Sequence, residues 1–494
     1  MGRSVALLLV LSLVRISCSC LDPSSAYKFT GAVCRLTYPA AVVLNEKTTK
    51  VIQAAFQHAR YPSIKGEKSM GFIGTVEYGF NNLEIHNLSI GKSEFELKEN
   101  EGIGIYISNV SAVFKGTIKY RYGSWLISVG QTVDFEIDSQ IDLVINSKLY
   151  CGKGKVAADT SNCYLTFHKL KLLLQGDRAP GWLKRMFTDI VTFTVKLVVK
   201  SQICKEINNV ANILADFIQE QAEQFISDGN IRVDISLTSS PIIKSNYIES
   251  YHKGLVNYNN EASVINSSVF NPSQLSENRM LYFWLSDGVL GPLMSAAYLD
   301  GRFIRNIPGT ELTDLFQTEL SSPRPELLSK WLSSEGPVLK ARSVSVPHLW
   351  TTTQGTSVRA VAGVELLLAN QEKPTLYFET DVTVVVRVSY VEKKLILKAT
   401  GELIHITKVS TSEGASEIEE SLKAYLQEAV EKMGIPKVIS YLEPELTALM
   451  DEQGLYLFDI INPEVVPQDG YVIVQLDFGF PHHLLVEFLR KTLD

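Results

Sequence analysis

Alternating apolar and polar residues predict long β-strands in both halves of the chain. In the first half, apolar residues occupy almost every second position from Val133 to Ile145, with mostly acidic or amide side chains between them. In the second half, valines alternate from Val382 to Val388, and Tyr390 continues the series. A period of two over such lengths is typical of a sheet with one wet face and one dry face.

Helical patterns precede and follow these strands, so the same layout occurs twice along the chain. Helices are expected over 42–60, from Pro180 onward and over 287–299, and a fourth begins at Ser416 and is expected to end at Gly434. The helix after Pro180 carries an apolar stripe with helical spacing. Its members are Ile203, Ile207, Val210, Leu214 and Phe217.

The first nineteen residues have the features of a secretory signal peptide. A basic start at Arg3 precedes an apolar run over 5–14, and the small residues Ser17 and Ser19 precede a cleavage point before Cys20. No later segment offers the roughly eighteen unbroken apolar residues that a transmembrane helix needs. We therefore expect a secreted, extracellular protein that has no transmembrane helix.

Composition shifts divide the rest of the chain. The stretch 254–278 holds six Asn and five Ser with little periodicity, which is typical of a linker. We expect an N-terminal domain over 20–253, a C-terminal domain over 279–475 and a tail over 476–494.

The pattern at the carboxyl end predicts a strand with alternating apolar and polar residues from Val472, followed by a short amphipathic helix in the tail. Pro481 suits the first turn of that helix, and Glu487 lies off its apolar face. The apolar face consists of Leu484, Leu485, Phe488, Leu489 and Leu493. The pattern alone leaves open whether this face packs on its own domain or covers something else.

Composition excludes several functional classes. Lys+Arg 47 against Asp+Glu 54 gives a net charge of −7, and loss of Arg3 and Arg15 with the signal peptide gives 45 − 54 = −9. A nucleic-acid-binding protein would need a basic surplus. A hydrophobic content of 45% with 20% charged residues excludes a disordered chain. A secreted chain with so high an apolar content has either a very large hydrophobic core or an apolar ligand.

No catalytic motif is present. The sequence lacks the Gly-x-Ser-x-Gly elbow of lipases and esterases, the His-Glu-x-x-His zinc motif and complete phosphate-binding or dinucleotide-binding glycine motifs. The eight His are scattered apart from His482 and His483, so no metal site stands out. We expect a protein that is not an enzyme and that holds no metal and no cofactor.

Five of the six cysteines lie beyond the signal peptide, in the first half of the chain: Cys20, Cys34, Cys151, Cys163 and Cys204. Their spacing fits no zinc pattern, so one or two disulfides are expected, and an odd count leaves at least one thiol over. Asn87, Asn109 and Asn266 begin N-glycosylation motifs.

Several segments resemble the secreted family of lipid-transfer and lipopolysaccharide-binding proteins, over nearly the whole mature chain. They are Gly31-Ala-Val-Cys-Arg-Leu-Thr, Val110-Ser-Ala-Val-Phe-Lys-Gly-Thr, Asp134-Phe-Glu-Ile-Asp-Ser, Cys163-Tyr-Leu-Thr-Phe-His-Lys, Gln202-Ile-Cys-Lys-Glu-Ile-Asn, Arg279-Met-Leu-Tyr-Phe-Trp, Phe458-Asp-Ile-Ile-Asn-Pro-Glu and Asp477-Phe-Gly-Phe-Pro. The resemblance implies an α+β fold of two tandem tapered barrels, each a twisted antiparallel sheet wrapped on a long helix. In that fold the barrels join at a central β-sheet in an elongated boomerang with a lipid tunnel.

The resemblance also assigns site residues. It implies a Cys163–Cys204 disulfide and places Gln219, Ser250 and His252 among the polar residues at the middle of the tunnel. By pattern alone, His252 is more readily explained as a hydrogen-bonded structural histidine. The family's basic residue two positions after the first of these is Gln221 here, which puts a charge-dependent lipid contact there in doubt. The terminal helix would gate one tunnel opening through Leu484, Leu485, Phe488 and Leu489.

The implied function is exchange of neutral lipids, namely cholesteryl ester and triglyceride with some phospholipid, between lipoprotein particles. The partners would be high-density, low-density and very-low-density lipoproteins (HDL, LDL, VLDL) in plasma, met by transient contact of a monomer with lipid surfaces. A phospholipid-transfer or lipopolysaccharide-binding relative on the same fold is the alternative. A secreted lipid-modifying enzyme is a minor one.

Overall fold

The computed structural model divides the chain into two compact units that interleave along the sequence. Unit 1 comprises Met1–Arg35, Glu220–Ser239 and Ser250–Gly479, and unit 2 comprises Leu36–Gln219, Ser240–Glu249 and Phe480–Asp494. The residues that the structure describes are 20–22, 27–59, 61–70, 74–123, 128–175, 181–225, 227, 229–270, 278–369, 371, 373–412, 416–452 and 459–479. The expected signal peptide, 1–19, lies outside them.

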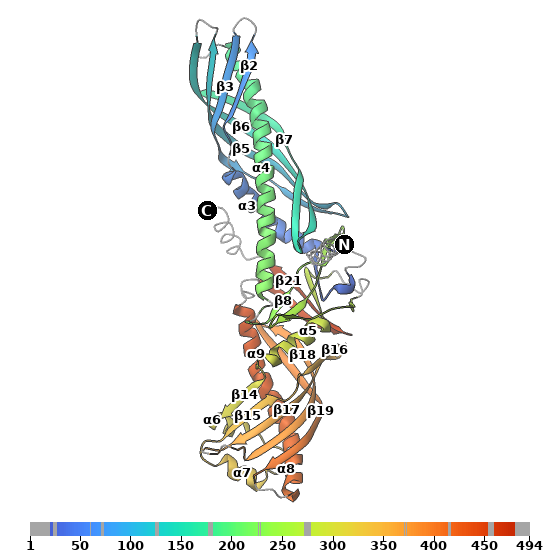
Figure 1. Ribbon diagram of the computed structural model, residues 1–494. Coiled ribbons are helices and arrows are strands. Elements are labelled where there is room, and N and C mark those ends of the chain that lie inside the picture. Colours follow the sequence, from blue (N-terminus) through green and yellow to red (C-terminus); the bar gives the residue numbers. More distant parts are fainter. Residues whose placement is uncertain are drawn as a thin grey trace, which may run out of the picture. The chain divides into compact units, whose positions relative to one another are not determined.

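Unit 2 is a long antiparallel sheet packed on long helices (Figure 1). The sheet has the order β2-β3-β5-β6-β7, with β4 paired to β5. Its strands are β2 (Ile64–Met70), β3 (Gly74–Ser89), β4 (Ser93–Lys98), β5 (Gly102–Gly123), β6 (Ser128–Gly152) and β7 (Lys155–Gln175), and its helices are α3 (Tyr38–His58) and α4 (Gly181–Phe225). The helix predicted over 42–60 is α3, which starts four residues earlier because Pro39 fits a first helical turn.

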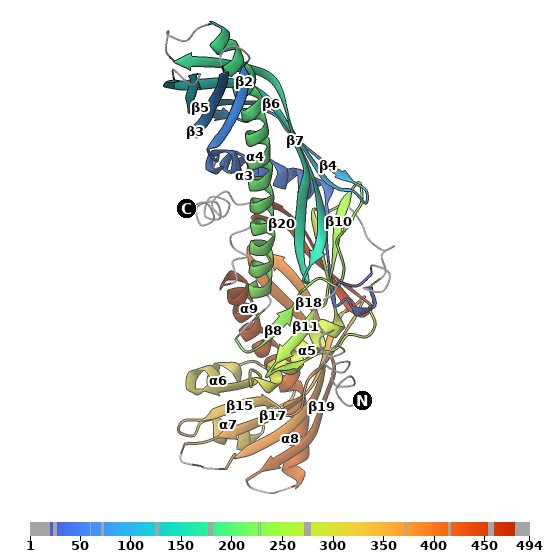
Figure 2. The ribbon, with the colours of Figure 1, turned by 45° about the horizontal axis from the view of Figure 1, so that its top comes forward.

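The predicted one-sided strand is β6, and its dry face forms the core of unit 2. Phe135, Ile137, Ile141, Leu143 and Ile145 are all buried, and the acidic residues between them are exposed or half-buried. They share a core cluster with the buried face of α4, which runs along the sheet (Figures 1 and 2). The buried residues of that helix are Ile190, Val191, Val195, Val199, Ile203, Ile207 and Val210. The predicted stripe is therefore confirmed up to Val210, and the side chains of Leu214 and Phe217 lie outside the described residues.

Bulges bend the sheet of unit 2 at two of the predicted glycosylation motifs. The β3–β5 register shifts between His86 and Ser89, and the β5–β6 register shifts between Ile107 and Val110. Asn87 and Asn109 within these bulges take positive φ angles of 48° and 57°. Asparagine tolerates that region better than most residues, so the same side chains that begin the motifs also shape the bulges.

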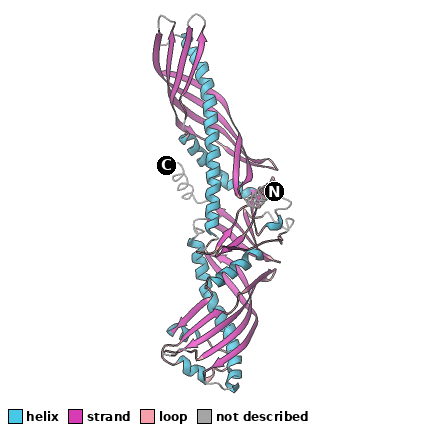
Figure 3. Ribbon diagram, in the orientation of Figure 1, coloured by secondary structure: helices cyan, strands magenta, loops and turns pink. Residues whose placement is uncertain are grey.

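Unit 1 contains a second long antiparallel sheet with helices packed on it (Figure 3). The order is β14-β15-β17-β18-β19, with β16 paired to β17. The strands are β14 (Ile304–Pro308), β15 (Val338–Ser343), β16 (His348–Thr352), β17 (Gly355–Leu367), β18 (Leu376–Val391) and β19 (Lys394–Thr411). The helices are α6 (Gly309–Leu315), α7 (Glu326–Leu332), α8 (Ser416–Ala429), the π-helix η4 (Val430–Gly434) and α9 (Ile435–Glu452). A core of residues such as Leu366, Ile406, Leu422 and Tyr425 joins α8 to the sheet.

The remaining elements form smaller assemblies. In unit 1, β20, β21, β13 and β1 are consecutive strands of one sheet, and β12, β11 and β8 form another. The bounds are η1 (Tyr27–Phe29), β1 (Ala32–Thr37), β8 (Arg232–Asp234), β9 (Ile242–Ile243), β10 (Tyr247–His252), β11 (Leu255–Tyr258), β12 (Glu261–Ala262), β13 (Leu281–Ser286), α5 (Asp287–Leu299), β20 (Asp459–Gln468) and β21 (Tyr471–Gly479). The stretch predicted as a linker thus contains β11 and β12.

Gly434 does not end its helix, so that prediction is wrong. The helix passes through η4 into α9 without a break, and Ile435 has φ −60° and ψ −51°, inside the right-handed helical region. Gly434 is not among the glycines with positive φ, whereas a glycine that ends a helix usually takes the left-handed conformation. Gly434 and Pro436 thus both lie inside a continuous helix, at the point where π-helical geometry changes to α-helical geometry.

The valine alternation of β18 does not translate into one buried face. Thr383 is only 6% exposed, whereas Val382, Val384 and Val386 are half-buried. The β18–β19 register shifts between Glu379 and Thr380 and again between Thr383 and Val384. Each shift places one extra residue on the neighbouring strand β19, Thr407 at the first shift and Glu402 at the second. Beside these bulges the buried positions of β18 change from Phe378 and Thr380 to Thr383, so a strict period of two in the sequence does not predict one buried face.

The outer strand of this sheet, β19, is hydrogen-bonded by α9. The backbone N–H of Leu395 donates to the hydroxyl of Thr447 at 3.0 Å, and that of Leu397 donates to a carboxylate oxygen of Glu443 at 2.6 Å. The helix therefore satisfies strand donors that would otherwise face solvent.

Among the described residues, no helix combines the length and apolar character needed to cross a membrane. The described part of the chain also contains no group of three or more His, Cys, Asp or Glu side chains placed to hold a metal ion.

Candidate functional site

Two of the predicted tunnel residues, Ser250 and His252, form a hydrogen-bonded pair on β10. They are two positions apart and so project from the same side of the strand. Oγ of Ser250 lies 2.8 Å from Nε2 of His252, and Nδ1 of His252 lies 2.7 Å from the carbonyl oxygen of Ile235. Both nitrogens of the ring are thus engaged.

These contacts fix the protonation state of the ring. A carbonyl oxygen only accepts, so Nδ1 must carry the proton and donate it to Ile235. Burial lowers the pKa of His252, and the bond to the Ile235 carbonyl opposes that effect only in part. The ring is therefore neutral, Nε2 is an acceptor, and the hydroxyl of Ser250 donates to it.

This pair lacks what a catalytic serine and histidine require. In hydrolases of that type a carboxylate orients the histidine and stabilises its charged form when the serine loses its proton. Here a neutral backbone carbonyl takes the orienting position, and burial opposes the charged ring. The arrangement suits a polar anchor for a neutral group better than a nucleophile.

The strand segment that carries the pair is tightly packed around two glycines. The N–H of Gly31 lies 3.0 Å from the carbonyl oxygens of both His252 and Lys253. A Cβ on Gly31 would lie 2.5 Å from the carbonyl oxygen of Lys253 and 2.5 Å from the side chain of Ile265. Gly254 has φ +67°, and a Cβ there would meet Val289 at 2.7 Å. Close approach thus fixes the position of β10.

A charged group also lies next to the pair. Asp234 accepts hydrogen bonds from the backbone and hydroxyl of Ser236, and its other oxygen lies 3.4 Å from the ammonium of Lys253. Burial alone would raise the pKa of Asp234, but the bonds from Ser236 and the nearby Lys253 lower it overall. The carboxylate stays ionised and is paired with Lys253. Its hydrogen bonds to Ser236 and its contact with Lys253 stabilise this segment.

An entirely apolar sheet face lies in unit 1, on strands β13, β21 and β20. The registers place Phe283 opposite Val474 and Val474 opposite Val465, with equivalent rows on either side. The members of this apolar face are Leu281, Phe283, Leu285, Val472, Val474, Leu476, Val465 and Pro467. Phe283 is 38% exposed, although it lies in the middle of the face. The apolar face can therefore contact a hydrocarbon ligand without competing polar groups.

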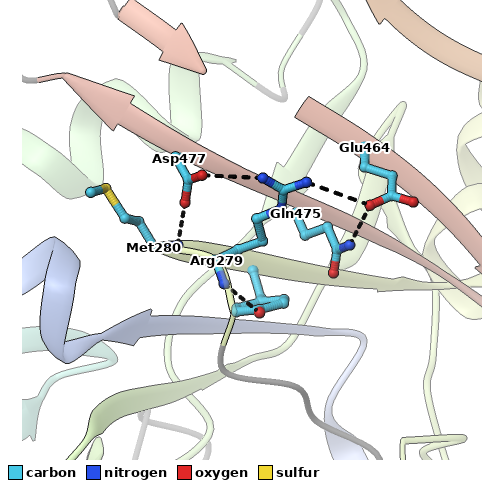
Figure 4. A network of polar contacts seen from close by, with 6 residues as sticks. Arg279, Met280, Glu464, Gln475 and Asp477 are labelled. Atoms are coloured by element: carbon cyan, nitrogen blue, oxygen red, sulfur yellow. Dashed lines mark hydrogen bonds and ion pairs between the residues drawn. The ribbon is translucent and has the colours of Figure 1, made fainter. Parts of the chain in front are cut away.

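The opposite face of the same strands carries a polar network (Figure 4). Nη1 of Arg279 lies 3.2 Å from Asp477, whose other oxygen accepts the N–H of Met280 at 2.9 Å. The Arg279 guanidinium also lies 3.9 Å from Glu464, and Gln475 donates to Glu464 at 2.6 Å. The network joins β20 and β21 to Arg279 and Met280, which directly precede β13, and leaves the apolar face without polar groups.

Aromatic residues complete this polar face. Tyr282 and Trp284 are stacked with ring centroids 5.5 Å apart, and the guanidinium of Arg35 lies 5.6 Å from the Trp284 ring. All three side chains are buried. Nothing in the alternation of the sequence distinguished this face, because a cation over an aromatic ring depends on pairing between distant strands.

The disulfide predicted from the resemblance, Cys163–Cys204, is present. It joins β7 to α4 with Cα atoms 5.7 Å apart. Cys20 and Cys151 are disulfide-bonded as well, in agreement with the expectation of one or two disulfides.

Several predicted site residues lie outside what the structure describes. Gln219 and Gln221 fall within α4, but their side chains lie outside the described residues. The gate residues Leu484, Leu485, Phe488 and Leu489 lie beyond Gly479, where the description ends. The three motif asparagines are described and exposed: Asn87, Asn109 and Asn266.

Comparison with known proteins gives a consistent result. The model of the LBP / BPI / CETP family, N-terminal domain, matches residues 43–217. Cholesteryl ester transfer protein of Gallus gallus is 47% identical over 492 residues, covering 98% of this chain and 97% of the relative. That of Homo sapiens is 44% identical over 468 residues, covering 93% and 94%.

More distant matches are shorter or weaker. Lipopolysaccharide-binding protein of Mus musculus is 23% identical over 266 residues, covering 52% of this chain and 53% of the relative. A crystal structure of lipopolysaccharide binding protein matches with a TM-score of 0.48 and 17% identity, covering 92% of this chain and all of that one.

Proposed function

Because the chain belongs to the LBP / BPI / CETP family and matches cholesteryl ester transfer proteins over nearly its whole length, we propose that it carries neutral lipids between lipoprotein particles. The lipids are cholesteryl ester and triglyceride, with some phospholipid. The full-length sequence similarity is the observation that carries this proposal, since in sequence lipopolysaccharide-binding protein of Mus musculus is only 23% identical and matches 52% of the chain.

The apolar face supports the proposal in structural terms. A folded protein normally buries a run of eight apolar side chains completely, whereas Phe283 in the middle of this face keeps 38% of its surface. We infer that acyl or sterol groups of a bound lipid lie against it.

Physical chemistry explains why a carrier is needed. Each CH₂ group removed from water is worth about 0.8 kcal/mol, so exposing an acyl chain of about eighteen carbons costs roughly 14 kcal/mol. At about 1.4 kcal/mol per decade, spontaneous desorption into water is slower by about ten orders of magnitude. A continuous apolar surface removes that barrier without any covalent step.

The polar pair has a role consistent with this transport. A neutral His252 and the Ser250 hydroxyl present hydrogen-bonding groups without a charge, which suits the ester oxygens of a neutral lipid. We propose that they lie in the lipid tunnel together with Gln219. Gln221, in place of a basic residue, removes a charge that would favour an anionic headgroup.

The site of action proposed is plasma, where the partners are HDL, LDL and VLDL. Disulfides such as Cys163–Cys204 are typical of chains that fold in an oxidising compartment. Contact with each particle is transient, and the carrier acts as a monomer.

The decisive experiment follows labelled cholesteryl ester from donor to acceptor lipoproteins in the presence of purified protein. We expect transfer of intact ester. Binding to both particles without movement of ester would contradict the proposal. Preferential movement of phospholipid, or capture of lipopolysaccharide, would favour the alternative relatives, and release of free cholesterol and fatty acid would reveal an enzyme.

A second experiment addresses the tail. We propose that the helix predicted after Pro481 gates a tunnel opening through Leu484, Leu485, Phe488 and Leu489. Deletion of 481–494 should reduce neutral-lipid transfer more than folding or secretion. Unchanged transfer by a well-secreted truncated protein would exclude the gating role.

A further inference from the structure

Two large apolar side chains point outward from α4 where folding does not require them. Phe193 is 67% exposed and Leu197 is 53% exposed, more than any other large apolar side chain among the described residues of unit 2. They are four positions apart and therefore neighbours on the helix surface. The buried face of the same segment is supplied by Val191, Val195 and Val199.

Lysines flank this apolar pair. Lys196 and Lys200 are exposed, and helical geometry places both on the same side of α4 as Phe193. The ammonium of Lys196 lies 5.9 Å from the ring centroid of Phe167 on β7, which places it at the border of the apolar pair on the β7 side. Asp189 is the acidic residue described on this side, so two cations stand against one anion in a chain of net charge −7.

We propose that this α4 patch, consisting of Phe193, Lys196, Leu197 and Lys200, is a contact site for the phospholipid surface of a lipid particle. The proposal rests on the proposed transfer function and adds to it the surface that meets the particle. Aromatic and aliphatic side chains bordered by lysines are what helices at a membrane interface present. The apolar pair would enter the acyl boundary while the lysines meet anionic headgroups.

The size of the patch favours a lipid over a protein partner. A stable protein interface buries more than about 1,000 Å² and requires matching side chains over some 20 or more residues on each side. Two apolar side chains need no such partner on a fluid lipid surface. Their small number also makes the contact weak and reversible, which a shuttle between particles requires.

The test measures binding to vesicles of phosphatidylcholine with and without phosphatidylserine. The Phe193→Ser, Leu197→Ser double variant should bind about a hundredfold more weakly, about tenfold for each side chain. Lys196→Gln with Lys200→Gln should abolish the gain from phosphatidylserine and the dependence on salt. Ile213→Ser is the matched control, because Ile213 is 42% exposed on the same helix but has Asn209 and Asp216 as exposed neighbours.

Transfer assays separate this proposal from the function on which it rests. The double variant should keep its circular dichroism, its bound lipid and its maximal transfer rate, and should need a higher particle concentration to reach it. Equal vesicle binding by the wild type, the double variant and the control would overturn the patch while leaving ester transfer intact. A change from dimer to monomer in the double variant, with vesicle binding unchanged, would instead assign the patch to self-association and would also overturn it.

Discussion

Ser250 and His252 are joined by a hydrogen bond of 2.8 Å between Oγ and Nε2, and the ring nitrogen on the other side donates to a backbone carbonyl. The pair is therefore built for an uncharged histidine. A half-buried ring that is fully engaged while neutral makes the stability of unit 1 depend on pH.

We expect the free energy of unfolding to fall as the pH drops below about 6.5. The pKa of His252 is lower in the folded protein than the value of about 6.5 for an unfolded chain, so the unfolded state binds the proton first. The contribution is fully present above the unfolded pKa and is lost at up to about 1.4 kcal/mol per pH unit below it. Urea denaturation between pH 7.5 and 5 measures this, within roughly the range where histidine titrates.

His252→Asn should remove that step while keeping a donor near the position of Nδ1. His348→Asn, at an exposed histidine, is the control and should leave the step in place. An identical pH profile for His252→Asn and the wild type would assign the acid sensitivity to other groups.

Gly31→Ala should destabilise unit 1 strongly. The added Cβ would lie 2.5 Å from a backbone oxygen and 2.5 Å from Ile265, so backbone must shift to make room. We expect a loss of about 1–3 kcal/mol or more in the free energy of unfolding, measured by denaturant titration. Gly181→Ala is the control, because nothing lies within 4 Å of its added Cβ at the start of α4, and it should leave the free energy of unfolding unchanged or raise it by up to about 0.5 kcal/mol.

Ser286→Ala should stabilise the protein, against the usual rule for a residue at a helix start. Ser286 precedes α5, yet its side chain makes no capping hydrogen bond, and among the described residues the buried hydroxyl has no partner. Replacement removes the cost of that unpaired group, about 1–3 kcal/mol.

Ser139→Ala is the matched control, since that buried hydroxyl donates to the carbonyl of Ala112 at 2.7 Å. It should lose about 1 kcal/mol. Calorimetry that showed both serine variants destabilised alike would mean that Ser286 has a partner after all.

Val474→Asp should empty the protein of lipid without unfolding it. The substitution places a charge in the centre of the apolar face, next to Phe283 and Val465. Mass spectrometry of co-purifying lipid should show a loss of neutral lipid of tenfold or more, since burying an unpaired charge against hydrocarbon costs several kcal/mol. Gln475→Leu, on the opposite face, should leave the lipid content unchanged; equal losses in both variants would argue against the apolar face as a lipid wall.

Much of the architecture could be predicted because it depends on local pattern. The limits of α5, Asp287–Leu299, match the expected helix, and β6 shows the alternation that its sequence carries. These elements bury one continuous side against a single neighbour, so the period of apolar residues is sufficient to identify them.

The failures concern features that a binary pattern does not encode. Two bulges of β19 lie beside the point where burial in β18 changes face, so Thr383 is buried where a valine was expected. Gly434 was expected to end the helix that begins at Ser416, because glycine is common at helix ends, but the helix continues through it. A glycine allows the left-handed conformation without imposing it.

The site shows the same division. The resemblance identified Ser250, His252 and the Cys163–Cys204 disulfide. The alternation from Val472 predicted the β21 part of the apolar face, but the sequence did not predict its pairing with β13 or the Arg279–Asp477 contact. Both depend on the register between β13 and β21, whose sequences lie almost 200 residues apart. The exposure of Phe193 and Leu197 could not be predicted for a different reason, since an exposed apolar residue and a core residue look alike in sequence.

The bonds from α9 to β19 have a consequence for association between molecules. An outer strand whose donors point into solvent can recruit a strand from another chain, which is how many β-rich proteins aggregate. The donors of Leu395 and Leu397 are already engaged by Thr447 and Glu443, so an incoming strand would have to displace a helix first. Over Leu395–Leu397 this edge of the sheet is therefore closed to the strand of a neighbouring molecule.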